Sequence, residues 1–283
     1  MLGDCWEYDI RSSVVAWKLG YAQDYVAQHC PNKTVDQVFT FSLLYLKNKP
    51  ALMANVKEAV FGKTSDLADA LQEKILKQAF TALSFGARAS GKAWVNQNGE
   101  WQNPSIADIF KRADERERFL EDCNVCGFVQ EQTALDDYFY TGVVQNYPDL
   151  LKLPHLQTQS GRPSKSKVVA FLYQHEETAV MDIVRATLAE HGKTVLANIH
   201  DAIVVKQRLS ADLKHEIEFL MQERTANPYW RLGAKQVQRW DVSAKQGKVQ
   251  EAAHRQRIAK EEALAAGYSN QWMQSFADDD YEE

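Results

Sequence analysis

Two aspartates stand in apolar, strand-like segments far apart in the chain. Asp9 interrupts a run rich in aromatic and β-branched residues at 5–17, and Asp201 lies between two apolar runs at 193–206. A carboxylate in such a place loses contact with water and needs a cation or a hydrogen-bond donor beside it. Two aspartates can hold two divalent ions, which stabilise the attacking and leaving oxygens of a phosphoryl transfer. For Asp201, the competing interpretation is an aspartate that only forms a hairpin turn.

A predicted helix at 66–85 carries a second group of chemically useful residues. Lys77 and Phe85 are eight residues apart, a little over two helical turns, and Thr81 lies midway on a similar face. A lysine can neutralise triphosphate charge, an aromatic ring can stack on a base pair, and Gly86 permits close approach of the backbone. The competing interpretation is an ordinary amphipathic helix with a solvated lysine and a buried phenylalanine.

The elements that would position these residues follow from local patterns. Aromatic and β-branched residues at 5–17 favour a strand that runs into a turn or helix, and two short strands flank His200 and Asp201. Helical patterns cover 35–48, 66–85, 172–190 and 210–224, whereas Asn98-Gly99 favours a hairpin or surface loop at 92–105. The charged segment 111–122 is typical of a solvated helix, and we assign it no function.

Composition places the chain among ordinary globular proteins. Its 283 residues are 45% hydrophobic, enough for one large domain or two smaller ones. We find no run of about 18 apolar residues and no signal-peptide pattern at the start, so we expect a cytoplasmic location and no membrane contact. The tail 276–283 alone contains five acidic residues, which account for the whole net charge of -5. The basic residues elsewhere can therefore still form a local cleft.

Four cysteines are too few for a disulfide framework in a chain of this length. Cys123 and Cys126, together with His29 and Cys30, offer four zinc ligands and hence a structural or nucleic-acid-binding module. A single C-x-x-C is weak support for zinc, and we favour ordinary reduced cysteines.

Taken in order, the motifs resemble those of the family A DNA polymerases and their relatives, the single-subunit phage and mitochondrial RNA polymerases. EYDIRSS around Asp9 resembles their first metal motif, and Lys77-QAFTALS-Phe85-Gly86 resembles their fingers helix. IHDAIVV at 199–205 resembles the second metal motif, a His-Asp in a strand-turn-strand.

Weaker matches fall between the fingers and the second metal motif. Tyr140-Thr-Gly-Val143 resembles the aromatic-x-Gly-Val that follows the fingers, and Thr158-Gln-Ser-Gly161-Arg162 resembles the Thr-x-x-Gly-Arg of the DNA polymerases. The segment 173–181 resembles the start of the helix along template and primer. The resemblance covers residues 5–225, and its specificity lies in the order of the motifs.

The resemblance implies an α+β fold with the right-hand architecture of polymerases. A palm, consisting of a small antiparallel sheet with helices, would comprise residues 1–30 and 151–225. Helical fingers would comprise residues 31–150. Residues 226–283 would add C-terminal helices and an acidic, disordered tail.

The resemblance also implies roles for individual residues. Asp9, Asp201 and Lys77 would be catalytic, and the two aspartates would bind two Mg²⁺ ions, with Mn²⁺ as an alternative. Lys77, with Lys74 beside it, would contact the nucleoside triphosphate, and Phe85 and Gly86 would contact the nascent base pair. The residues expected to contact template or primer are Arg162, Gln174 and His200.

We therefore expect a nucleotidyltransferase that takes a nucleic-acid template, a primer and nucleoside triphosphates. DNA synthesis is the favoured activity, in DNA replication; an RNA polymerase subunit and a catalytically degenerate accessory subunit are the alternatives. The first motif lies within ten residues of Met1, so we expect a partner subunit or domain to supply the thumb. Such a reduced polymerase suits a phage or mobile element, and then the cytoplasm of its host.

The chain departs from the family pattern at four positions. Glu73 stands where the fingers helix usually has an arginine, four residues before Lys77. Arg11 and Val14 replace a serine and a glutamate, and the glutamate helps to exclude ribonucleotides. Phe85 lacks the hydroxyl that helps the RNA polymerases select ribose, which favours deoxynucleotides, whereas Val14 favours the opposite.

Overall fold

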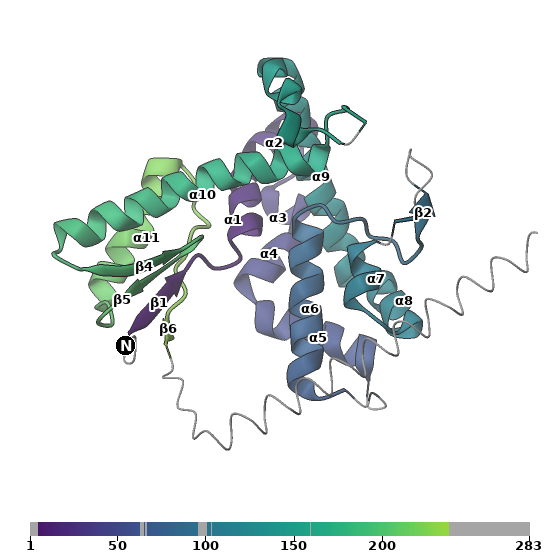
Figure 1. Cartoon of the computed structure of the whole chain (residues 1–283), viewed down its shortest axis with the longest axis horizontal. Coiled ribbons are helices and arrows are strands. Elements are labelled where there is room, and N and C mark those ends of the chain that lie inside the picture. The colour runs from purple at the N-terminus through teal and green to yellow at the C-terminus, as the bar shows by residue number, and fades with distance from the viewer. Residues whose placement is uncertain are drawn as a thin grey trace, which may run out of the picture.

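The computed structural model describes residues 5–237, apart from 63, 64, 66, 96–100, 103 and 159. Helices dominate this part of the chain, and they adjoin a small antiparallel sheet (Figure 1). The strands are β1 (Trp6–Asp9), β2 (Trp94–Val95), β3 (Trp101–Gln102), β4 (Val195–Ile199), β5 (Ala202–Val205) and β6 (Lys235–Gln236). The α-helices are α1 (Ser13–Gly20), α2 (Ala22–His29), α3 (Val35–Val38), α4 (Thr40–Lys47), α5 (Lys49–Phe61), α6 (Asp69–Ser84), α7 (Ser105–Ile109), α8 (Ala113–Glu121), α9 (Cys123–Asn146), α10 (Lys165–Glu190) and α11 (Ala211–Thr225). Two short 3-10 helices, η1 (Pro148–Lys152) and η2 (Pro154–Leu156), precede α10.

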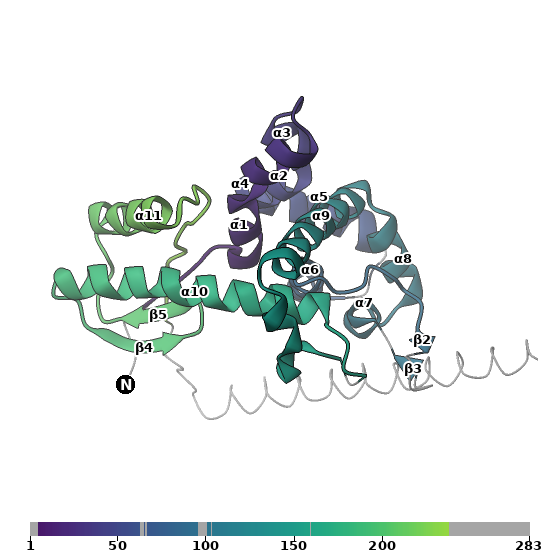
Figure 2. The same ribbon diagram turned by 90° about the horizontal axis from the view of Figure 1, so that it is seen from above.

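The main sheet has the strand order β4-β5-β1-β6, and neighbouring strands are antiparallel. β5 lies between β4 and β1, and all four of its residues, AIVV, are buried. An apolar strand of this kind is typical of the inside of a sheet that is covered on both faces. α10 and α11 pack against each other and lie to one side of the sheet (Figure 2).

The helical part is organised around α9, which packs against α4, α6, α8 and α10. α10 extends from the sheet to these helices, as Figure 1 shows. α1 lies between the two parts and is buried along almost its whole length, with Trp17 stacked on Phe139 at a ring-centre distance of 4.4 Å. A helix that is apolar on all sides is expected at such an interior position. Residues of both parts share one continuous core.

Several predicted elements are confirmed. β1 runs into α1, α6 lies within 66–85, β2 pairs with β3 in the 92–105 segment, and β4 and β5 flank His200 and Asp201. The predicted helix at 35–48 is divided into α3 and α4, because the chain turns at Phe39 to bury its ring completely. The helix predicted at 172–190 begins earlier, at Lys165, because Val168 and Val169 extend its buried face.

The prediction of C-terminal helices is wrong for the part of 226–283 that the structure describes. Residues 226–237 contain β6 and no helix, because this segment adds an edge strand to β1 and places Trp230 and Leu232 in the core. The rest of the predicted C-terminal helices, and the acidic tail, lie outside the described residues. No helix in the described ranges is long and apolar enough to cross a membrane.

Candidate active site

Asp9 and Asp201 lie at adjacent strand ends. Asp9 is the last residue of β1 and lies opposite Ala202, the first residue of β5. The Ile10 N–H donates a hydrogen bond of 3.0 Å to the carbonyl of Asp201. Burial raises the pKa of the Asp201 carboxyl above its usual range, and the negative charge of Asp9 raises it further. The fold therefore pairs the two predicted carboxylates, and their binding of metal ions stays a prediction.

The turn that holds Asp201 has an unusual backbone. Only His200 and Asp201 connect β4 to β5, and His200 has a φ of 48°. Two-residue hairpin turns require a positive φ at their first central position, a conformation that is uncommon for residues with a side chain. The turn leaves the His200 side chain exposed beside Asp201. Its positive charge, when present, would stabilise the ionised Asp201.

A chain of hydrogen bonds holds the Asp201 side chain. Ser13 Oγ donates to Asp201 Oδ2 at 3.2 Å, and the Tyr173 hydroxyl lies 2.7 Å from Ser13 Oγ. The same hydroxyl is hydrogen-bonded to Glu177 Oε1. Three hydrogen bonds thus connect Asp201 to Glu177 through the hydroxyls of Ser13 and Tyr173. Each hydrogen bond needs one proton, and the two hydroxyls supply only two. All three links form at once only if one carboxyl group carries the third proton.

The environment of Glu177 agrees with this proton count. Burial raises the pKa of the Glu177 carboxyl, and the negative charge of Asp201 raises it as well, although the hydrogen bond with Tyr173 opposes the shift. Two partly buried carboxyl groups therefore share one region without enough protons to neutralise both. Either a bound cation or proton sharing must offset their repulsion.

Gly233 closes the other side of Asp9. Its N–H donates to the Asp9 carbonyl at 2.7 Å. A Cβ at Gly233 would lie 2.0 Å from Asp9 Oδ1 and 3.6 Å from Arg11 Cγ. No side chain fits this position unless the Asp9 carboxylate moves, so the glycine leaves the space that this carboxylate occupies.

The end of α6 reaches the same site. The ring of Phe85 is 38% exposed, and it packs edge-on against Tyr173 at a ring-centre distance of 5.6 Å. Gly86 has a φ of 78°, and a Cβ there would meet Asp136 Oδ2 at 3.1 Å. Tyr173 therefore connects the predicted stacking residue to Asp201. Part of the Phe85 ring remains open to a ligand, in contrast to the competing interpretation of a buried phenylalanine.

Lys77 and Lys74 both lie exposed on α6. The positive charge of Lys77 reaches the hydroxyl of Tyr45, which lies in the core below it. Burial raises the pKa of Tyr45 to about 12, and the Lys77 charge opposes that rise. Glu73, at the position where the resemblance expects an arginine, is ion-paired with Lys57 at 3.2 Å.

The residues expected to contact template or primer are separated. Gln174 is exposed on α10, next to Tyr173, and His200 is exposed beside Asp201. Arg162 lies in a tight turn, where its carbonyl accepts a hydrogen bond of 2.8 Å from the Thr158 N–H. Among the described residues, no hydrogen bond or ion pair joins Arg162 to the aspartate pair.

The zinc alternative finds no support in the described part of the chain. No group of three or more His, Cys, Asp or Glu side chains there could hold a metal ion. His29 packs its ring against Tyr25 and Tyr138, and Cys126 Sγ donates to the Leu120 carbonyl at 3.0 Å. Asp9 and Asp201 are two side chains and so fall short of a group of three. A metal ion bound by them would need further oxygen ligands from water or substrate.

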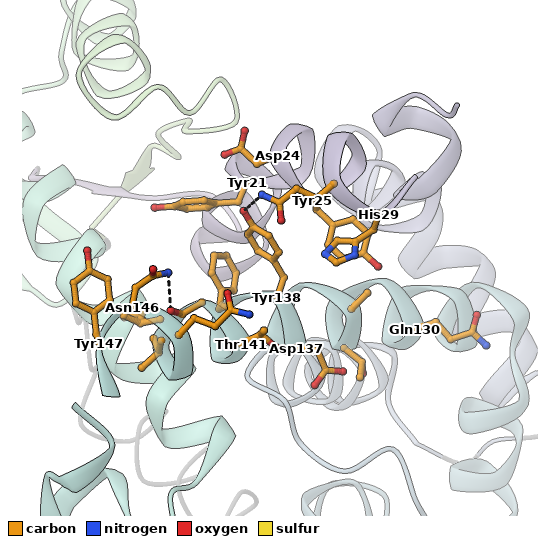
Figure 3. A pocket seen from close by; sticks show the side chains of 18 of the residues that line it. Tyr21, Asp24, Tyr25, His29, Gln130, Asp137, Tyr138, Thr141, Asn146 and Tyr147 are labelled. Carbon is orange, nitrogen blue, oxygen red and sulfur yellow. Dashed lines mark hydrogen bonds between the residues drawn. The ribbon is translucent and has the colours of Figure 1, made fainter. Parts of the chain in front are cut away.

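A separate pocket of about 950 Å³ lies between α2 and α9. Figure 3 shows Tyr21, Tyr25 and Tyr138 at its wall, with Asp24 and Asp137 among the polar residues. Neither Asp9 nor Asp201 lines it. The pocket is therefore distinct from the aspartate pair.

Sequence reasoning missed the supporting residues of this site. Tyr173 and Glu177 are one helical turn apart on α10, a spacing that places both on one face. Ser13 begins α1, four residues after Asp9. Tyr173 was recognised only as part of a motif, and nothing in the sequence indicates that Gly233 contacts Asp9.

Comparisons with known proteins give a structural likeness and no sequence match. No protein-family model and no curated protein matches the sequence. Among solved structures, the chain is similar to the POL domain of Pol1 from M. smegmatis in complex with a DNA primer-template and dNTP, with 14% sequence identity and a TM-score of 0.45. The match covers 86% of this chain and 41% of that one, so the chain spans less than half the length of that polymerase domain.

Proposed function

We propose that this chain carries the nucleotidyl-transfer site of a template-directed nucleic-acid polymerase that synthesises DNA. One observation supports the proposal above others. Asp9 and Asp201 meet at adjacent strand ends, and Phe85 is connected to Asp201 through Tyr173 and Ser13. The three motifs that resemble the polymerases are thus linked to one another by a short series of contacts through Tyr173 and Ser13.

The donor atoms at this place suit Mg²⁺ or Mn²⁺. Both cations prefer carboxylate and water oxygens, and Mg²⁺ keeps several waters or takes phosphate oxygens from a substrate. Asp9 and Asp201 would hold the ions, which when bound stabilise the attacking and leaving oxygens of the transfer. The role of Ser13 is to fix the Asp201 carboxylate, since its hydroxyl donates directly to Oδ2.

The remaining groups would bind substrates. Lys77 would offset triphosphate charge, because its ammonium is exposed and carries no ion pair among the described residues. The exposed part of Phe85 would stack on the nascent base pair. Gln174 and His200 are exposed on either side of the Tyr173–Asp201 chain and would contact primer or template. Arg162, in the turn before α10, would contact nucleic acid away from the aspartate pair.

The preference for deoxynucleotides rests on Phe85, whose ring offers no hydroxyl for a ribose. Val14 stands at the position that excludes ribonucleotides in the resembling DNA polymerases, but here its side chain is only 6% exposed. It therefore presents little surface to a sugar. RNA synthesis is the competing activity, and the experiment below compares the two directly.

Primer extension tests the proposal. Wild-type protein is supplied with primed DNA or RNA templates, with deoxy- or ribonucleotides, and with Mg²⁺ or Mn²⁺. We expect deoxynucleotide incorporation by the wild type, a loss of at least about 100-fold in Asp9→Asn and Asp201→Asn, and normal incorporation by Asp149→Asn. Asp149 is a suitable control because it is a surface aspartate paired only with Lys152. Unchanged incorporation in Asp201→Asn, or no incorporation by folded wild type in any combination, contradicts the proposal.

A further inference from the structure

Lys49 places a positive charge at the Asp9 end of the site. It is the first residue of α5, and its Nζ lies 3.3 Å from Ser12 Oγ and 4.4 Å from the ring centre of Tyr45. Ser12 belongs to the short connection between β1 and α1, so it is close in sequence to Asp9. Burial lowers the pKa of the Lys49 ammonium, and the negative charge of Asp9 opposes that shift.

The partners of Lys49 leave much of its charge uncompensated. No carboxylate in the described residues forms an ion pair with it; a hydroxyl and an aromatic face are its recorded neighbours. An ammonium group has three hydrogens to donate, and partial burial without a counter-ion is unfavourable. A half-buried lysine in this state suits an anionic ligand that is absent from the protein alone.

Lys49 and Lys77 converge on the same aromatic residue. Lys49 lies over the ring of Tyr45, and the charge of Lys77 reaches the Tyr45 hydroxyl. Tyr45 is only 3% exposed and packs against Phe80 and Phe128, so it is a rigid support. Two cations from different helices, α5 and α6, thereby act on Tyr45, and the charge of Lys49 also interacts with that of Asp9.

The site also lacks a cation where the resemblance expects one. Glu73 replaces that arginine, and it is engaged with Lys57. A nucleoside triphosphate carries several negative charges, and the two lysines of α6, Lys74 and Lys77, leave some of them unmatched. Lys49 is a half-buried cation whose charge interacts with that of Asp9, and it has no carboxylate partner in the described chain.

We propose that Lys49 binds the phosphates of the incoming nucleoside triphosphate, together with Lys77, and that Tyr45 and Ser12 hold its ammonium in place. This inference rests on the proposed polymerase function. It assigns the missing phosphate contact to the start of α5, outside every motif that resembles the polymerases.

The test measures phosphate binding apart from incorporation. Wild type, Lys49→Gln, Lys49→Arg and the control Lys47→Gln are titrated with dATP and with inorganic tripolyphosphate, without primer, so that no transfer can occur. Lys47 is a suitable control because it is exposed and pairs only with Asp36, at 3.4 Å. We expect Lys49→Gln to weaken binding of both ligands at least about tenfold. Lys49→Arg should recover most of the affinity, and Lys47→Gln should match the wild type.

Titration with Mn²⁺ alone separates this role from simple neutralisation of Asp9. Loss of a positive charge beside Asp9 should leave the Mn²⁺ affinity equal or greater, since it removes a repulsion. If Lys49 only neutralises Asp9, Lys49→Gln will bind Mn²⁺ more tightly with unchanged affinity for tripolyphosphate, which overturns the inference. Equal thermal unfolding of wild type and variant shows that the comparison is between folded proteins.

Primer extension distinguishes failure of this inference from failure of the polymerase proposal. A wild type that incorporates nucleotides, combined with a Lys49→Gln variant of unchanged KM, rejects the role of Lys49 and leaves the polymerase proposal standing. A wild type that neither incorporates nucleotides nor binds dATP rejects both. The expected result is a KM for deoxynucleotide raised about tenfold, with a smaller change in kcat.

Discussion

Ser13 Oγ donates a hydrogen bond to Asp201 Oδ2 across 188 residues of sequence. Ser13 begins α1, which follows β1, the strand that ends in Asp9. The bond therefore ties the Asp9 segment to the turn that holds Asp201. Both aspartates are positioned by the same short connection.

Ser13→Ala should loosen Asp201 without removing a carboxylate. Groups that orient metal ligands typically contribute about 10- to 100-fold in metal affinity or activity, and we expect a loss in this range in both Mn²⁺ affinity and primer extension. Ser90→Ala is the control, because Ser90 Oγ accepts a hydrogen bond only from the nearby Lys92 N–H. Full Mn²⁺ affinity in Ser13→Ala would show that Asp201 needs no such support.

Glu177→Gln should move the acidic limit of Mn²⁺ binding to lower pH. Asp201 has a raised pKa, so its carboxylate gains a proton, and loses its metal affinity, as pH falls through that raised value. Asp201 and Glu177 repel each other when both are ionised, and the neutral glutamine removes this repulsion. The pKa of Asp201 in the variant should therefore fall.

The glutamine amide, which can both accept and donate, still forms a hydrogen bond with the Tyr173 hydroxyl at every pH, so the chain to Ser13 is kept. Mn²⁺ titrations between pH 4 and 8 measure the shift. Glu176→Gln is the matched control, since the charge of Glu176 acts on Tyr21 instead. If the acidic limit of Mn²⁺ binding moves to higher pH in Glu177→Gln, the charge of Glu177 does not raise the pKa of Asp201, and the prediction is wrong.

Gly233→Ala should displace the Asp9 carboxylate. The new Cβ would lie 2.0 Å from Asp9 Oδ1, which no packed structure tolerates, and the carboxylate is the group that can rotate away. We expect loss of most primer-extension activity together with moderate destabilisation. Because Gly233 does not have a positive φ, backbone strain does not account for the effect.

Gly142→Ala provides a matched glycine substitution. Gly142 lies inside α9, and a Cβ there meets nothing within 4 Å. Alanine in a helix interior is favoured over glycine by about 0.5–1 kcal/mol, so this variant should unfold at an equal or higher temperature and remain active. Equal activity of the two alanine variants would show that the space beside Asp9 is not needed.

Local patterns were sufficient to predict the strands and helices that carry the aspartates, Lys77 and Phe85. Their alternation and helical periodicity depend on near neighbours in the chain, which the sequence displays. The order of the motifs predicted that Asp9 and Asp201 lie close together. In the β1–β5 register, Asp9 lies opposite Ala202, the residue after Asp201. The secondary-structure predictions failed where distant packing decides. Phe39 interrupts a helical pattern to reach the core, and the segment 226–237 forms no helix but pairs residues 235–236 with β1.

The supporting residues could not be predicted for the same reason. Lys49 and Gly233 come from segments with no recognisable motif, and Glu177 lies in the 173–181 motif without a role of its own there. The importance of all three lies in contacts made only after folding. A lysine that begins a helix is typical of many surfaces. Its nearness to Ser12 and Asp9 depends on the packing of α1, α4 and α5.

Lys18 and Asp136 form a buried ion pair beneath the end of α6. Lys18 is fully buried, and its Nζ lies 2.5 Å from Asp136 Oδ1 and 2.6 Å from the carbonyl of Ser84. Burial lowers the pKa of Lys18 and raises that of Asp136, although each charge stabilises the other. The pair joins α1 to α9 and to the residue before Phe85, so it sets where the end of α6 lies.

Lys18→Met should destabilise the protein by about 3–5 kcal/mol, because it leaves Asp136 buried without its partner. Asp136 alone has a raised pKa in the folded state, so the variant loses stability as pH rises from the unfolded value of about 3.9 through the raised one. Its deficit relative to wild type should be smaller at pH 5 than at pH 8. Denaturant unfolding at both pH values measures the difference.

Asp136→Leu should show the opposite pH dependence. Lys18 alone has a lowered pKa in the folded state, so the folded protein loses this proton more readily than the unfolded chain does, and the variant regains stability as pH rises. The double variant Lys18→Met/Asp136→Leu removes both charges and should lose much less than either single variant. Lys47→Met, in an exposed pair, should change stability by about 0.5 kcal/mol or less. Equal deficits at both pH values in the two single variants would show that the buried charges are not the cause.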